Sequence, residues 1–172
     1  TLIERNAQRQ QLSRQDRGLL NAIVLAVLRN RRLLDHWIAK LRRGKLDHET
    51  REILRVGLAQ LLILGIADHA AVNETVNCGK APVRGLINAV LRQAIATRSS
   101  LLDDMEDVPT AVQLSHPDWL WNRWKNSFGN AKATQLLEWN NQPAKTFGRI
   151  NPLKEGARET VEAYDKATPV DG

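Results

Sequence analysis

The chain has 172 residues, of which 42% are hydrophobic, a net charge of +6 and a single cysteine. This length suits one domain, or one domain with a small attachment. No apolar run reaches the roughly 18 residues of a membrane span, and a lone cysteine excludes an internal disulfide. We therefore expect a cytoplasmic protein with a real hydrophobic core and no membrane contact.

The first half of the chain predicts a succession of amphipathic helices. Ser13 is expected to cap one of them, with Asp16 completing a variant of the capping box. The apolar face of this helix follows the 3.6-residue period and comprises Leu19, Leu20, Ile23, Val24, Val27 and Leu28. In the following helix the same period gives the face Leu34, Trp37, Ile38 and Leu41.

Three further helices complete the expected bundle. Asp47 should cap the first of these, which is apolar nearly all round from residue 56 to residue 64 and belongs at the centre. The next contains Cys78, and the last begins at Pro82, a residue suited to a first helical turn. The predicted fold class is all-α, with a helical bundle over residues 1–98.

The second half of the chain differs in character. Residues 99–115 are polar and acidic and predict a linker, and residues 116–143 predict a helical connector. Ser115 is expected to cap the first connector helix and Gly129 to follow its end. Residues 145–151 predict a strand, and residues 155–167 a weak helix. Because one strand cannot make a sheet, residues 144–172 are expected to be the start of a truncated α/β domain.

Cys78 raises the question of catalysis. A nucleophilic thiol needs a nearby base, a cation or a helix N-terminus, but Cys78 falls at the end of its helix. His69 lies nine residues away, about 13 Å along the axis and on the opposite side. Because Ala71, Thr75 and Cys78 share a face, we expect a packed cysteine. The alternative is a reactive thiol, because the neighbouring cation Lys80 could favour the thiolate.

No other catalytic pattern is present in the sequence. The four histidines (His36, His48, His69 and His116) lack metal-ligand spacing, and there is no second cysteine. The cluster of acidic residues 103–107 predicts solvated carboxylates. There is also no glycine-rich phosphate loop. We therefore expect neither a catalytic residue nor a metal site in this chain.

The positive charge is the main functional signal. Residues 1–98 carry 17 Lys and Arg against 8 Asp and Glu, whereas residues 99–172 carry 8 against 11. Arg32, His36, Lys40 and Arg43 recur on one helix face, opposite the apolar one. The candidate RNA-binding residues are Arg14, Arg17, Arg29, Arg31, Arg32, Lys40, Arg42, Arg43, Lys45, Arg84 and Arg92. The alternative is an ordinary solvated surface.

Tryptophans in the connector allow two interpretations. Trp119, Trp121 and Trp124 alternate with basic residues and could stack on unpaired bases. However, Trp121, Trp124 and Phe128 also have the spacing of a packed helix face. We favour packing in the core or between domains.

Three segments carry a family resemblance over residues 2–98: "SRQDRGLLNAIVLAVLRNRRLLDHWIAKL", "ILRVGLAQLLILGIADHAAVNETV" and "RGLINAVLRQ". They resemble the NusB-like RNA-binding domain. The later "SHPDWLWNRWKNSFG" and "LLEWNNQPAKTFGRINPLK" are similar to the connector of RsmB-type ribosomal RNA cytosine 5-methyltransferases. Compared with that family, one basic helix at the N-terminus is missing, and the connection "NETVNCGKAPVRGLIN" is short.

This resemblance implies a parent protein that transfers a methyl group from S-adenosylmethionine to carbon 5 of a cytosine in ribosomal RNA. In that family two cysteines of a Rossmann-like domain act on the base, and Cys78 matches neither motif. We therefore interpret the chain as the inactive RNA-binding region of such an enzyme, whose partners are ribosomal RNA and the missing C-terminal methyltransferase domain. A transcription antitermination factor of the NusB type, binding leader RNA and protein partners, is the alternative. A scaffold that docks the catalytic domain through its tryptophans is a third possibility.

Overall fold

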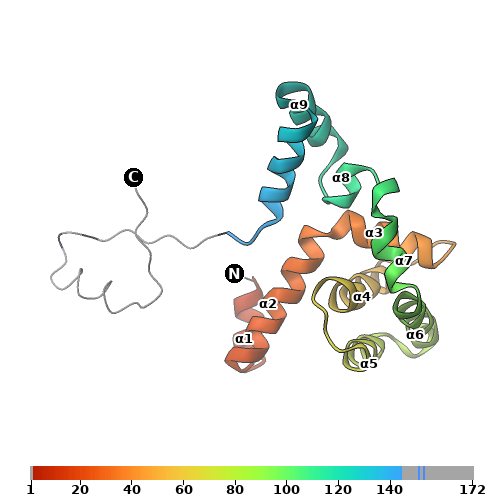
Figure 1. The fold of residues 1–172 in the computed structure, drawn as a ribbon. Helices are drawn as coiled ribbons and strands as arrows, with labels where there is room; N and C mark the ends of the chain where they lie inside the picture. The colour runs from red at the N-terminus through yellow and green to blue at the C-terminus, as the bar shows by residue number, and fades with distance from the viewer. Residues whose placement is uncertain (1, 145–150, 152, 154–172) are drawn as a thin grey trace. The chain divides into compact units, whose positions relative to one another are not determined.

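The computed structural model describes residues 2–144, 151 and 153, which contain helices and no strand (Figure 1). In chain order the elements are α1 (Leu2–Arg9), α2 (Arg14–Arg29), α3 (Arg31–Leu41), α4 (His48–Leu58), η1 (Ala59–Ile63), α5 (Asp68–Cys78), α6 (Ala81–Ala96), α7 (Arg98–Asp103), η2 (Asp104–Asp107), α8 (Thr110–Gln113) and α9 (Asp118–Asn141). The all-α prediction is confirmed for these residues. Residues 145–150 of the predicted strand and the whole of the predicted helix 155–167 lie outside them.

Two compact units divide the chain, Thr1–Asn141 and Gln142–Gly172. The first unit holds every helix named above. The boundary expected near residue 98 does not coincide with this division, because α7, α8 and α9 belong to the same unit as the bundle.

Local capping follows the sequence. Ser13 Oγ accepts a hydrogen bond from the Asp16 backbone N–H at 3.1 Å and donates to the Asp16 carboxylate at 2.7 Å. Asp47 caps α4 by accepting from the Thr50 backbone N–H at 2.9 Å. The hydrogen bonds from Thr50 lower the pKa of Asp47. Both predicted caps are therefore confirmed.

The core lies among α3, α4, α5 and α6. Leu34, Trp37, Ile38 and Leu41 of α3 are buried, as the sequence predicts. Gly57 allows α4 to approach its neighbours closely, since a Cβ atom there would lie 2.8 Å from a Leu91 methyl group and 2.9 Å from the Thr75 methyl group. A larger residue at position 57 would therefore force α4 away from α5 and α6.

The central helix ends in a wider π-helical turn, η1. The Leu64 N–H bonds to the Ala59 carbonyl at 2.9 Å, and Gly65 follows with φ +62°. Gln60 is buried within this turn, where its amide donates to the Thr75 hydroxyl at 3.1 Å. This bond gives both buried polar side chains a hydrogen-bond partner inside a mainly apolar core.

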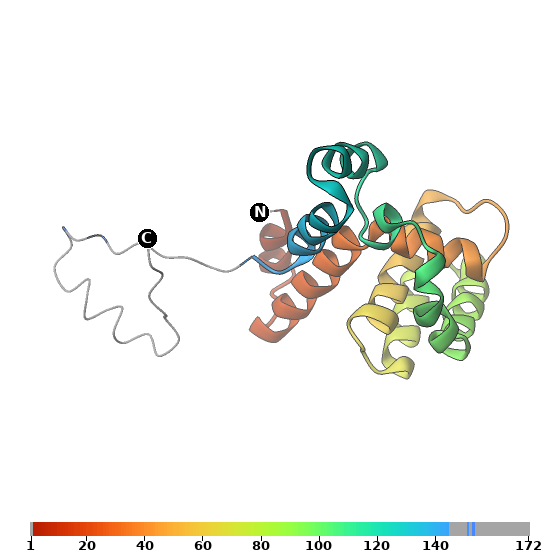
Figure 2. The same ribbon diagram turned by 45° about the horizontal axis from the view of Figure 1, so that its top comes forward.

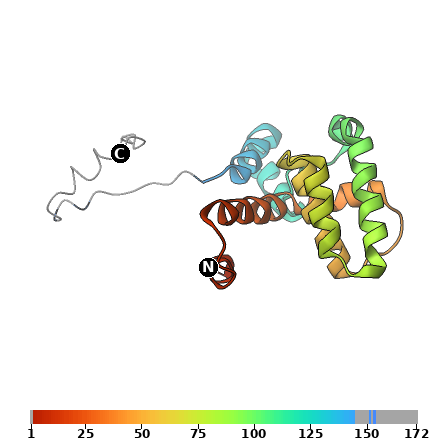
Figure 3. The same cartoon turned by 90° about the horizontal axis from the view of Figure 1, so that it is seen from below.

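Helix α2 forms where the sequence predicts it, but its apolar face is only partly buried. Of its residues only Ala26 is buried, while Leu19, Leu25 and Leu28 are exposed by 42–63%. The N-terminal half of α2 projects away from α4, α5 and α6, as Figure 3 shows. The periodicity correctly predicts the helix. On its apolar face Leu20, Ile23, Val24 and Val27 are half-buried, whereas Leu19 and Leu28 are exposed, because little of the bundle lies alongside the N-terminal half of α2.

Residues 99–115 are folded rather than forming a simple linker. They contain most of α7 together with η2 and α8, and Leu101, Val108 and Ala111 are buried. The Trp37 indole N–H donates to the Leu101 carbonyl at 3.2 Å, which joins α7 to α3. Apolar residues interspersed among the acidic ones therefore fix this segment against the bundle.

The connector forms a bent helix. Gly129 interrupts α9 with φ +78°, so two helical halves meet there at an angle (Figure 2). The prediction that a helix ends next to Gly129 is confirmed. Ser115, however, does not cap α9, since its backbone has φ +57° and two residues, His116 and Pro117, separate it from Asp118.

Candidate nucleic-acid interface

Cys78 is exposed at the last position of α5, so the predicted packing of its side chain is wrong. Ala71 and Thr75 on the same helix are buried, as expected. At the next residue, Gly79, a Cβ atom would lie 2.6 Å from an Ile87 methyl group, so Gly79 rather than Cys78 packs closely against α6. His69 lies at the other end of α5, where it cannot act on the thiol.

The helix face expected to carry Arg32, His36, Lys40 and Arg43 does not form a free basic surface. The Arg32 guanidinium binds both carboxylate oxygens of Asp118 at 3.0 Å and also donates to the His116 carbonyl. Lys40 pairs with Asp104 at 3.0 Å, and its hydrogen bond lowers the pKa of Asp104. Two of the predicted RNA-binding residues therefore hold the segment from α7 to α9 against α3.

His36 lies between these two cations on α3. Its Nε2 atom is buried and has no hydrogen-bond partner among the described residues. Burial, and then the charge of Lys40, lower the pKa of His36 below 6.5. A neutral imidazole at this position does not contribute to a basic surface near pH 7.

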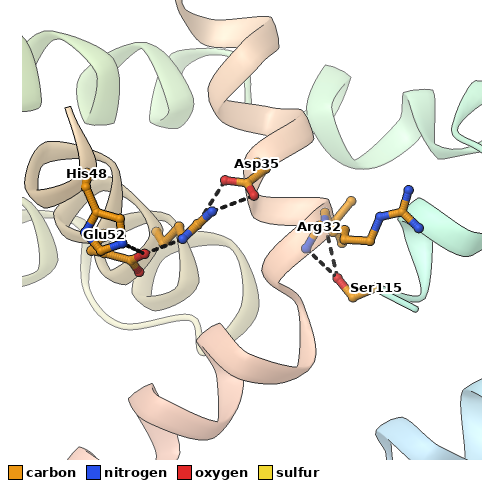
Figure 4. Close-up of polar contacts among 7 residues, drawn as sticks. Arg32, Asp35, His48, Glu52 and Ser115 are labelled. Atoms are coloured by element: carbon orange, nitrogen blue, oxygen red, sulfur yellow. Dashed lines mark hydrogen bonds and ion pairs between the residues drawn. The ribbon is translucent and has the colours of Figure 1, made fainter. Parts of the chain in front are cut away.

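The N-terminus of α3 is capped from a distant part of the chain. Asn30 precedes α3 but makes no capping bond to it. Instead Ser115 Oγ accepts from the backbone N–H groups of Arg32 at 2.9 Å and Leu33 at 3.2 Å (Figure 4). The residue that the sequence assigns to α9 thus caps α3.

Arg55 is a buried cation that sequence reasoning missed. Its guanidinium binds both oxygens of Asp35 at 2.9 and 2.6 Å and also bonds to Glu52, while His48 lies beside Glu52 (Figure 4). Burial opposes its charge, but Asp35 and Glu52 outweigh that effect and raise the pKa of Arg55. The arginine is engaged in the fold and unavailable to a ligand.

The remaining predicted cations face solvent to different degrees. Those whose side chains have no partner within the described part of the chain are Arg14, Arg29, Arg31, Arg43 and Lys45. Four others are oriented by a single hydrogen bond: Arg17 to the Leu12 carbonyl, Arg42 to the Lys45 carbonyl, Arg84 to the Gly79 carbonyl and Arg92 to the Asn88 side chain. Such side chains keep donors for a phosphate.

A groove of about 370 Å³ lies between α5 and α6, which run side by side (Figure 3). Val72, Val76 and Ile95 line it, together with polar residues that include Asn88 and Arg92. Arg84, Asn88 and Arg92 recur at intervals of four residues and form a ridge along α6, and two of these three residues border the groove.

The aromatic residues of α9 only partly support the packing interpretation. Trp121 and Trp124 are half-buried, and the Trp124 ring lies 6.5 Å from the His116 ring. Phe128, Trp119 and Trp139 are more than half exposed. Packing of Phe128 is therefore wrong within the described residues.

Among the described residues, no group of three or more His, Cys, Asp or Glu side chains could hold a metal ion. Likewise, none of the helices described is both long and apolar enough to cross a membrane.

Two protein-family models match this chain over different residue ranges. Residues 1–96 match the model of the NusB family. The chain belongs to the NusB family. Residues 116–168 of this NusB-family chain match a second model, the Methyltr_RsmF/B-like ferredoxin-like domain. Both halves of the resemblance seen in the sequence are therefore confirmed.

Curated relatives of this NusB-family chain are similar along most of its length. The "Probable ribosomal RNA small subunit methyltransferase B" of Synechocystis sp. is 33% identical over 94% of the chain. The "Ribosomal RNA small subunit methyltransferase B" proteins of Thermus thermophilus and Pasteurella multocida are 37% and 36% identical over 85% and 84% of the chain. The chain spans only 38%, 35% and 33% of the lengths of these three relatives.

Proposed function

We propose that this chain is the RNA-binding region of an S-adenosylmethionine-dependent ribosomal RNA cytosine 5-methyltransferase. The observation that carries the proposal is the pair of family matches, with residues 1–96 matching the NusB family and residues 116–168 the RsmF/B-like ferredoxin-like domain. Relatives that are similar to most of this chain are named ribosomal RNA small subunit methyltransferase B. The substrate class proposed for the parent is therefore ribosomal RNA, and we propose a cytoplasmic location to match.

The unpaired cations form the proposed contact surface. Arg43 and Lys45 lie in the loop between α3 and α4, next to Arg42, and both are exposed. Arg31 is exposed at the start of α3, and Arg14 at the start of α2. Exposed Arg and Lys side chains displace the counterions of a phosphate backbone, which is the main source of affinity for RNA.

Arg32 and Lys40 are assigned a different role within this proposal. Their charges are held by Asp118 and Asp104, so they fix the connector to the bundle rather than contacting RNA directly. Of the eleven candidate residues, we therefore retain the other nine as RNA contacts.

Methyl transfer is assigned to the rest of the parent protein. S-adenosylmethionine would supply the methyl group there, and no residue of this chain matches the cysteine motifs that act on the base. The role proposed for this chain is to bind ribosomal RNA and so bring the target cytosine to a catalytic domain.

A transcription antitermination factor is the alternative from another functional class. The NusB match alone is compatible with both functions, but the match over residues 116–168 favours the methyltransferase, because it adds a segment typical of methyltransferases.

Direct binding to small-subunit ribosomal RNA fragments tests the proposal. Fluorescence anisotropy at low salt should show binding by the wild-type chain, and the double variant Arg43→Glu, Lys45→Glu should bind at least about tenfold more weakly. The matched control, Arg123→Glu with Lys132→Glu on α9, changes the net charge equally and should lose no more than about twofold.

Two results would contradict this assignment. Equal losses in the two double variants would show that only net charge matters, not the loop between α3 and α4. Absence of binding by the wild-type chain at low salt would refute RNA binding altogether.

A further inference from the structure

We infer that the groove between α5 and α6 binds one unpaired nucleotide of the RNA. This inference rests on the proposed RNA-binding function and names a specific subsite for it. The groove measures about 370 Å³, within the usual range for small-ligand sites. It lies in the basic half of the chain, apart from the loop that carries Arg43 and Lys45.

The floor of the groove suits the face of a base. Val72 of α5 is buried, and Val76 on the same helix is half-buried one turn later. Ile95 of α6 lines the groove with them. These aliphatic side chains present an apolar surface, and a flat nucleobase lying on it would remove apolar area from water on both sides of the contact.

The rim of the groove offers donors and an acceptor that the fold leaves free. The Asn88 Oδ1 atom accepts from Arg92 Nε at 3.0 Å, so the Asn88 amide N–H groups remain available. On α5 the Asn73 amide donates to Glu74 at 3.2 Å, which leaves the Asn73 Oδ1 atom as an acceptor. A donor on one helix and an acceptor on the other match the edge of a base, which presents both kinds of group.

The charge at the mouth suits the phosphates on either side of a nucleotide. Arg92 is exposed and held by Asn88 through its Nε atom, so its terminal nitrogens face solvent. Arg84 lies two turns earlier on α6, held in the same way by the Gly79 carbonyl. The one carboxylate that lines the groove, Asp68, is already paired with Arg98 and does not present a free negative charge.

An unpaired nucleotide is favoured over a stem because of the shape of the site. Proteins read RNA sequence mostly from unstacked bases, whose edges are accessible, whereas paired bases in an A-form helix are not. A narrow space between two helices admits one base but no duplex. The ridge of Arg84 and Arg92 beside it remains open to the backbone.

The test compares two RNAs, one a stem closed by an unpaired loop and the other a blunt duplex with the same stem sequence. Asn88→Leu preserves the side-chain size but removes both the donor and the anchor of Arg92. It should weaken binding to the loop RNA by about tenfold and leave binding to the duplex unchanged. Asn77→Leu, on the exposed side of α5 outside the groove, is the matched control and should change neither affinity.

A second measurement guards against a folding defect. Titration of the wild-type chain with cytidine 5′-monophosphate should shift backbone amide NMR signals of residues 68–76 and 88–95 and leave those of α2 and α3 unchanged. Circular dichroism melting of Asn88→Leu should give a melting temperature close to that of the wild-type chain.

The remaining outcomes would overturn the assignment in distinguishable ways. If the chain binds both RNAs and Asn88→Leu weakens both equally or neither, the groove is not a nucleotide site, although RNA binding stands. A groove that binds a protein segment instead would leave both RNA affinities unchanged in Asn88→Leu, and cytidine 5′-monophosphate would not shift the NMR signals of the groove residues. If the wild-type chain binds neither RNA, the proposed function and the groove assignment fail together.

Discussion

At the scale of single residues, Arg55 is the most consequential charge in the described part of the chain. It is 4% exposed and joins Asp35 on α3 to Glu52 on its own helix. Arg55→Ala would leave two carboxylates facing each other without their cation. We expect a loss of about 2–3 kcal/mol in the free energy of unfolding, below the cost for a fully buried pair because both carboxylates reach solvent.

Urea denaturation followed by circular dichroism measures this loss. Arg51→Ala is the matched control, since Arg51 is exposed on the same helix and should cost less than about 0.5 kcal/mol. Equal effects of the two substitutions would show that the Arg55 cluster adds nothing to stability.

His36 predicts how stability depends on pH. Its pKa is lowered from 6.5 in the folded chain, so the unfolded chain binds the proton more readily. The contribution of His36 to the free energy of unfolding is therefore fully present above pH 6.5 and is lost as the pH falls below that value. We expect the melting temperature to fall between pH 7.5 and pH 5, and to fall less in His36→Gln.

A control separates this effect from other titrations. His69 is exposed, and His69→Gln should retain the wild-type dependence on pH. Asp47 and Asp104, whose pKa values are lowered, lose their contributions only as the pH falls through and below 3.8, outside this window. A pH dependence unchanged by His36→Gln would contradict the assignment.

At the scale of elements, the junction between α8 and α9 stabilises α3. Ser115→Ala removes the oxygen that accepts from the Arg32 and Leu33 N–H groups, and we expect a loss of about 1 kcal/mol. Thermal or chemical denaturation measures it. Ser127→Ala on the exposed side of α9 should be neutral, and an equally neutral Ser115→Ala would show that the cap does not matter.

Local sequence rules predict where the helices lie, but they do not always predict which residue caps a helix. Ser13 and Asp47 cap their own helices, and each is predicted from its own residue type and the first turn that follows it. Ser115 has the same chemistry but caps a helix that begins more than 80 residues earlier. No periodicity or local spacing contains that information, because it depends on how α8 meets α3.

In the candidate site too, some features follow from the local sequence and others depend on how the helices pack. The positions of Arg32 and Lys40 on the polar face of α3 follow from helical geometry. That both find carboxylates in residues 99–118 depends on the packing of a segment whose acidic composition predicts a linker. The groove between α5 and α6 likewise needs two helices in contact, although the ridge of Arg84, Asn88 and Arg92 on one of them is visible in the sequence.

At the scale of the whole molecule, the charge is positive in residues 1–98 and negative beyond them. Part of the negative charge is used internally, where Asp104 and Asp118 hold the cations of α3. Asp103 and Asp107 are exposed and have no partner among the described residues. These two carboxylates make no contact that stabilises the described part of the fold. Their negative charges repel an approaching polyanion.

Neutralising these two carboxylates should therefore strengthen RNA binding. We expect Asp103→Asn with Asp107→Asn to raise the affinity about twofold to threefold at low salt, because two charges that repel the phosphate backbone are removed. The difference should disappear above about 0.5 M salt, where the Debye length falls to a few ångströms. Anisotropy titrations across a salt series measure both effects. An affinity gain that persists at high salt would instead indicate a direct contact, and no gain at any salt would show that RNA binds beyond the reach of the acidic segment.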